Sequence, residues 1–119
     1  YEKITFKSLK HTEIIDLYNQ SKVILDINHP NQTGLTMRVF EALGSGKKLI
    51  TSNAEIKRYP FYNTNNILVF DRNNIELDKS FFDKSFKKID ENLYERMFIN
   101  GFLEELFFSN GKNDWLVFD

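Results

Sequence analysis

The chain alternates between short apolar runs and segments in which apolar residues recur every three or four positions. The runs predict strands and the periodic segments predict helices. Three of the runs are almost continuously apolar, which is typical of parallel strands covered on both faces by helices. The pattern therefore predicts an α/β fold with a small, mostly parallel sheet of about four strands and a helical C-terminal part. The predicted strands are 1–7, 22–28, 48–52 and 67–70, and the predicted helices are 12–20, one within 34–46, 54–58, 78–88 and 91–108.

Length and charge limit the possible classes of protein. The 119 residues suffice for one domain with a hydrophobic core, and we interpret 1–119 as a single domain. Sixteen basic and seventeen acidic residues give a net charge of −1, so a nucleic-acid partner is not indicated. No apolar run approaches the roughly 20 residues that cross a bilayer. The chain opens without methionine inside a predicted strand, which favours a fragment of a larger protein.

Metal and thiol chemistry are not expected. Cysteine is absent, which excludes disulfides and thiolate catalysis and allows a reducing compartment. His11 and His29 lie far apart without ligand spacing, so no metal site is predicted.

The most informative stretch is the polar loop 28–33 and the helix that follows it. The loop lies at the carboxyl end of a predicted strand, where open α/β sheets bind ligands. Thr33 or Thr36 can cap the helix, and Gly44 or Gly46 can end it. A helix start offers free N–H groups and a positive dipole end, which suits a phosphate.

Side chains on this helix could add to a phosphate site at its start. Met37, Phe40 and Leu43 are predicted to face the core. Arg38 adds a permanent cation near the helix start, and Glu41 could accept two hydrogen bonds from a sugar diol. The simpler interpretation is a solvated Arg38–Glu41 pair, worth a few tenths of a kcal/mol.

Residues 38–46, Arg-x-Phe-Glu-Ala-Leu-Gly-Ser-Gly, are followed by a strand that ends in Thr51-Ser52. This pattern resembles the donor-binding segment of GT-B glycosyltransferases of the bacterial "glycosyl transferases group 1" type. The resemblance covers residues 14–71. It implies that Glu41 binds the ribose of a nucleotide sugar, and that the backbone before it approaches the diphosphate and the sugar. Many members have another glutamate at the position of Thr33 and a proline at that of Lys48. The donor-binding residues implied are Gly34, Leu35, Thr36, Met37, Arg38 and Glu41.

The resemblance also implies the context of the chain. It predicts the later part of a partial Rossmann-like, three-layer C-terminal domain, whose N-terminal acceptor domain is missing here. The parent enzyme would transfer a sugar during polysaccharide, lipopolysaccharide or protein glycan synthesis. It would need no metal or cofactor, and would work in the cytoplasm or at the inner face of the membrane. The isolated chain is expected to be inactive, because its catalytic cleft needs both domains.

Two further residues near this stretch are candidates. His29 could hydrogen-bond a donor phosphate or sugar, although a half-exposed loop histidine without a partner is the favoured interpretation. Asp26 interrupts an apolar run, so it is expected at the carboxyl end of its strand or beside a donor, because an unpaired buried carboxylate is costly.

Two other classes of function remain open. A Rossmann-like module that binds a nucleotide or partner without catalysis is favoured by Thr33 in place of a glutamate. A flavodoxin- or receiver-like signalling domain is the second class. A receiver needs a cluster of acidic residues at strand ends and a lysine after the last strand, and only Asp26 and Asp71 are acidic residues at predicted strand ends.

The strand order 3-2-1-4-5-6 of the family would leave strand 23–27 at a sheet edge in this chain. We expect residues 4–6 to pair with it. A homodimer or the apolar tail 115–118 are the other possible covers.

Overall fold

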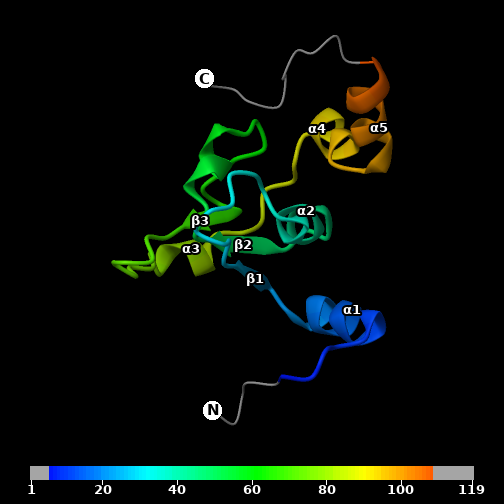
Figure 1. Cartoon of the computed structure of the whole chain (residues 1–119). Helices are drawn as coiled ribbons and strands as arrows, with labels where there is room; N and C mark the ends of the chain where they lie inside the picture. The colour runs from blue at the N-terminus through cyan, green and yellow to red at the C-terminus, as the bar shows by residue number, and fades with distance from the viewer. Residues whose placement is uncertain (1–5, 109–119) are drawn as a thin grey trace.

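The computed structural model describes residues 6–108, apart from some side chains of the last helix. Three parallel strands are interleaved with helices, which confirms the α/β fold (Figure 1). No helix in the described range is long and apolar enough to cross a membrane. The elements are α1 His11–Gln20, β1 Val23–Asp26, α2 Met37–Gly44, β2 Lys48–Thr51, the 3₁₀ helix η1 Ala54–Arg58, β3 Ile67–Val69, α3 Ser80–Asp83, α4 Glu91–Arg96 and α5 Ile99–Phe108.

The sheet has the order β1-β2-β3, and all pairs are parallel. Ile24 pairs with Leu49, and Leu49 pairs with Ile67. Helices α1 and α2 lie on one side of the sheet and α3 lies on the other (Figure 1). This arrangement is compatible with a partial Rossmann-like domain.

The described sheet has three strands, where the sequence predicted about four. Phe6 and Lys7 belong to no strand, and the side chain of Phe6 is 99% exposed. Most of the predicted first strand lies outside the described residues, as does the predicted tail 115–118. At residues 6 and 7 the predicted strand is therefore wrong, because alternation alone provides no pairing partner.

Helix α2 packs on the sheet through Val39, Ala42 and Leu43, all of which are at most 1% exposed. The predicted face of Met37, Phe40 and Leu43 is partly wrong, since the Met37 side chain is 72% exposed. The spacing i, i+3, i+4 from Val39 produces a narrower buried stripe, which leaves Met37 beside the loop.

Among residues 6–108, strand β1 is covered on one face, not on both as predicted. Ile24 is buried against α2 and β2, whereas Leu25 on the opposite face is 53% exposed. On the α3 side of the sheet, Phe81 of α3 contacts Lys48 of β2.

The segment after residue 78 is less helical than its pattern predicts. Helix α3 ends after one turn, where the buried Lys48 ammonium donates hydrogen bonds to the carbonyl oxygens of Phe81 and Lys84. Burial lowers the pKa of Lys48, with a smaller contribution from Lys84. The Asn66 side chain binds the backbone of Lys87, which follows α3 in the chain. It accepts a hydrogen bond from the Lys87 N–H and donates one to the Lys87 carbonyl, each at 2.7 Å.

The predicted long C-terminal helix is divided into α4 and α5. The division falls at Met97–Phe98, a few residues before Gly101, although glycine is the residue here that most disfavours a helix interior. Gly101 instead lets α5 approach α4, because a Cβ there would overlap the backbone of Arg96.

Candidate functional site

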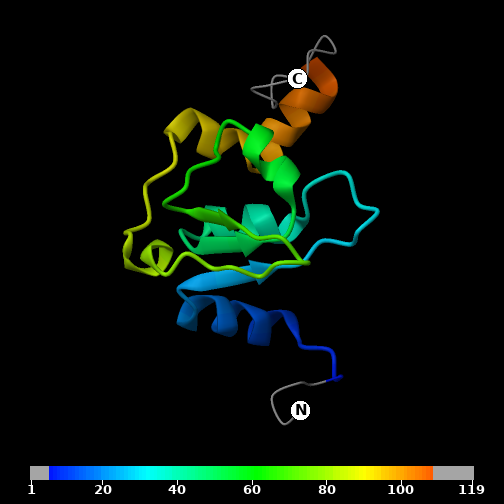
Figure 2. The same cartoon turned by 90° about the vertical axis from the view of Figure 1, so that its left-hand side faces the viewer.

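The loop 27–36 leaves the carboxyl ends of the strands and leads to the start of α2 (Figure 2). Thr36 is the N-cap residue of α2 and has extended backbone angles, φ −81° and ψ 158°. Its side chain makes no capping hydrogen bond to the helix. Its hydroxyl donates instead to Asp26 Oδ1, at 2.8 Å. The predicted side-chain cap is therefore wrong for Thr36, although the helix begins there.

Asp26 lies at the carboxyl end of β1, and its side chain is 2% exposed. The Thr51 hydroxyl donates to its second oxygen at 3.0 Å, so both carboxylate oxygens have partners. This confirms the predicted position of Asp26 beside donors at the end of a strand.

The two residues before Thr36 are also held. The Asn53 side-chain amide donates to the carbonyl oxygen of Gly34 at 3.1 Å. Leu35 is half-buried and packs against the hydrophobic core. Residues 34–36 are thus held at the carboxyl end of the sheet, and Thr33 just before them is exposed.

Arg38 and Glu41 extend from the exposed face of α2 and meet Tyr18 of α1. The Tyr18 hydroxyl donates to Glu41 Oε2 at 3.3 Å, and the Arg38 charge acts on the same hydroxyl. Partial burial and then the Glu41 charge raise the pKa of Tyr18, while Arg38 acts in the opposite direction. Sequence reasoning did not identify Tyr18 as a site residue, because its position is part of the apolar stripe predicted for this helix.

This contact predicts how the tyrosine responds to substitution. A Glu41→Gln variant is expected to lower the pKa of Tyr18, because the charge that disfavours the phenolate is removed. Arg38→Ala is expected to raise it further, since a stabilising cation is lost. A pH titration of isotope-labelled tyrosine rings by NMR measures both. If neither substitution moves the Tyr18 titration relative to Glu95→Gln, the three side chains are not in contact.

His29 is part of a tight turn in the loop. Its Nδ1 accepts a hydrogen bond from the Asn31 N–H at 3.2 Å, and its carbonyl accepts one from the Gln32 N–H at 2.9 Å. The side chain is exposed. The described contacts of His29 are thus local to this turn.

A second cluster of polar side chains, at the same carboxyl end of the sheet, was not predicted. The Ser52 hydroxyl donates to Asn28 Oδ1 at 2.6 Å, and the Asn28 N–H donates to Ser52 Oγ at 3.2 Å. Arg72 contacts both oxygens through Nη2, at 3.4 and 3.3 Å. The only available signal was topological, because each of the three residues follows the end of a parallel strand.

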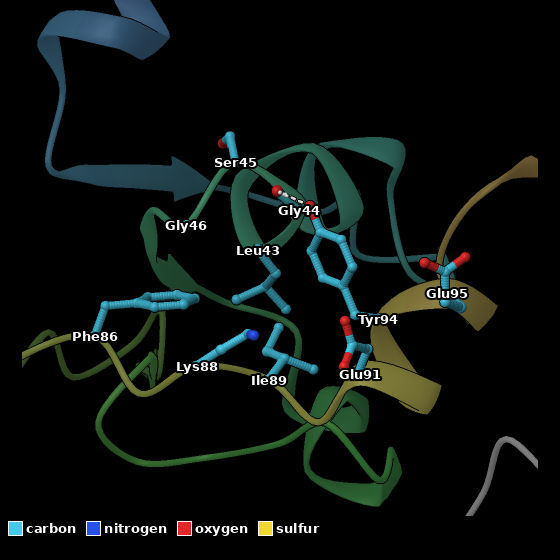
Figure 3. A pocket seen from close by; sticks show the side chains of 10 residues that line it. All are labelled: Leu43, Gly44, Ser45, Gly46, Phe86, Lys88, Ile89, Glu91, Tyr94 and Glu95. Atoms are coloured by element: carbon cyan, nitrogen blue, oxygen red, sulfur yellow. Dashed lines mark hydrogen bonds between the residues drawn. The ribbon is translucent and has the colours of Figure 1, made fainter.

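A cavity of about 470 Å³ lies at the other end of α2 (Figure 3). There Gly46, with φ 69°, ends the helix as the sequence predicted for Gly44 or Gly46. The Tyr94 hydroxyl donates to the Gly44 carbonyl at 2.8 Å. Since eight helical residues span about 12 Å, this cavity is separate from the loop. Its lining residues are Leu43, Gly44, Ser45, Gly46, Phe86, Lys88, Ile89, Glu91, Tyr94 and Glu95.

Metal-ligating side chains do not gather at either place. Within residues 6–108, no group of three or more histidine, cysteine, aspartate or glutamate residues could hold a metal ion.

Comparison with known proteins gives one match. A family model described as "Glycosyl transferase-like" matches residues 4–97, which include the whole sheet, the loop and α2. No curated protein and no solved structure matches the chain.

Proposed function

The chain belongs to the glycosyl transferase-like family, and on this premise we propose that it binds the nucleotide-sugar donor of a bacterial glycosyltransferase. The observation that carries the proposal is the fixed backbone 34–36 at the start of α2, with Arg38 and Glu41 exposed on the following turn.

The proposed chemistry is electrostatic. Transfer of a sugar from such a donor leaves a nucleoside diphosphate, whose developing negative charge must be stabilised. The N–H groups of the first turn of α2 carry a partial positive charge, and the Thr36 side chain makes no capping hydrogen bond to them. Arg38 adds a full charge to this end of the helix. Backbone amides and one cation would then act in place of a metal ion.

Glu41 would hold the ribose. Its carboxylate is exposed, and the contact of Oε2 with Tyr18 is long, at 3.3 Å. Acceptor sites on both oxygens therefore remain for two ribose hydroxyls. The backbone of Gly34, Leu35, Thr36 and Met37 would face the diphosphate and the sugar, and His29 and Thr33 would lie at the outer side of the loop.

The wider context is proposed on the same grounds. The acceptor would be held by a separate domain, and transfer would take place between the two. The reaction would belong to the synthesis of a polysaccharide, a lipopolysaccharide or a protein glycan, in the cytoplasm or at the inner face of the membrane.

Titration with UDP and GDP, followed by amide NMR shifts, tests the proposal. Shifts are expected at residues 34–41. Shifts confined to the cavity around Glu91 and Glu95 would contradict this placement, and absence of binding to either nucleotide would contradict donor binding itself.

A Glu41→Gln variant makes the test specific. It should weaken UDP or GDP binding about tenfold, because a charged acceptor of two hydrogen bonds is lost. The melting temperature should stay nearly unchanged, because Glu41 is exposed. Glu95→Gln, which removes an exposed carboxylate of α4 beside the cavity, is the matched control and should leave binding unaltered. Equal effects of the two substitutions would refute the ribose contact.

A further inference from the structure

Asp26 is a buried carboxylate that the proposed donor contacts do not use. Its side chain is 2% exposed, and an unpartnered carboxylate at that depth would be strongly destabilising. Both of its partners are threonine hydroxyls: Thr36 in the loop and Thr51 at the end of β2.

These contacts continue to the loop by a second route. Thr51 Oγ1 accepts a hydrogen bond from the Asn53 N–H at 3.1 Å, and the Asn53 side chain donates to the Gly34 carbonyl. The loop is therefore attached to the sheet at Gly34 and at Thr36. We call Asp26, Thr36, Thr51, Asn53 and the Gly34 carbonyl the Asp26 network.

The contact with Asp26 also sets the conformation of Thr36. A threonine at an N-cap usually accepts a hydrogen bond from a first-turn N–H of its own helix. Here the hydroxyl points to Asp26 as a donor, and no side-chain cap is formed. The Val39 N–H donates to the Thr36 carbonyl at 3.1 Å, and the Thr36 side chain caps none of the first-turn N–H groups. The N–H groups that precede Val39 in this turn are the ones that an oxygen from outside the chain would use.

We propose that Asp26 is a positioning residue, which acts through Thr36 to hold the start of α2 ready for a phosphate oxygen of the donor. This inference rests on the proposed function. Asp26 does not touch the donor. It fixes the backbone beforehand, so that less conformational freedom is lost when the nucleotide binds.

The test compares Asp26→Ala, Thr36→Val and the double variant with wild type. Thr36→Val keeps the shape of a half-buried side chain and removes only its hydroxyl, so it serves if Asp26→Ala does not fold. Ile67→Val, which removes a buried methyl group from β3, is the control for a general loss of stability.

The first measurement needs no nucleotide. Amide shifts and hydrogen exchange at residues 34–38 are expected to change in Asp26→Ala and Thr36→Val, but not in Ile67→Val. Unchanged amides in Thr36→Val would overturn the inference whether or not the wild type binds a nucleotide.

The second measurement is the affinity for UDP and GDP, well below the melting temperature of each variant. Each single substitution should weaken binding about tenfold. The double variant should bind no more weakly than the weaker-binding single variant, because both act on one contact. If the wild type binds a nucleotide and Asp26→Ala and Ile67→Val weaken this binding equally, Asp26 is not a positioning residue. The proposed function would then still stand. A wild type that binds neither nucleotide would refute the proposed function instead.

Discussion

An Asn66→Ala variant is expected to lose about 3 kcal/mol of unfolding free energy. The Asn66 side chain is 1% exposed and makes two hydrogen bonds of 2.7 Å, one to the N–H and one to the carbonyl of Lys87. Alanine would remove both bonds and leave the two backbone groups without these partners. Urea denaturation followed by circular dichroism measures the loss, which corresponds to a fall of about 10 °C or more in melting temperature.

Asn73→Ala is the matched control, because this exposed asparagine belongs to the loop after β3. It should change the unfolding free energy by less than about 0.5 kcal/mol. If Asn66→Ala were equally mild, the extended segment around Lys87 would not be held to the sheet by this side chain.

Replacement of Arg38 with alanine is expected to weaken UDP and GDP binding by about 10- to 100-fold. The estimate follows from the loss of a charge-assisted hydrogen bond to phosphate, worth about 1.5–3 kcal/mol, where about 1.4 kcal/mol is tenfold in affinity. Stability should change little, because Arg38 is exposed on α2. Isothermal titration calorimetry at low ionic strength, where the charge acts most strongly, measures the affinity.

Lys57→Ala removes a charge of the same sign from exposed η1 and is the control for net charge. Its effect on affinity should be small and should vanish in 0.5 M salt. An Arg38→Ala variant that behaves like Lys57→Ala would show that Arg38 contributes only to the general field of the protein.

The described elements from α1 to β3 follow closely from the sequence, because residues near each other in the chain determine them. Helix η1 occupies the predicted residues, and the Asn53 side chain caps it by accepting from the Glu55 N–H. Gly46 follows the last turn of α2 with a positive φ, which residues other than glycine rarely adopt. The glycine therefore marks the helix end in the sequence itself.

The C-terminal part departs from its pattern because contacts from distant residues decide it. Lys48 belongs to a strand and Asn66 to a turn, yet their side chains bind backbone 21–36 residues further along. These bonds compete with helix formation between residues 78 and 88. The spacing of apolar residues between 78 and 88 therefore could not reveal these bonds from distant residues.

The candidate site divides in the same way. The loop and the start of α2 could be predicted because they are contiguous in sequence. Tyr18 and Arg72 could not be, since Tyr18 contacts Glu41 across 23 residues and Arg72 contacts Asn28 across 44. Only the packed sheet and helices bring them to the site.

The strand order of the sheet has a consequence for how the protein is made. The spatial order β1-β2-β3 is also the order of synthesis, and each strand pairs with the one made just before it. During translation, β2 therefore meets a neighbour that has already left the ribosome, and β3 does so in turn. No described strand has to be inserted between two others after the chain is released. Each strand can therefore pair with its neighbour during translation, as soon as it leaves the ribosome.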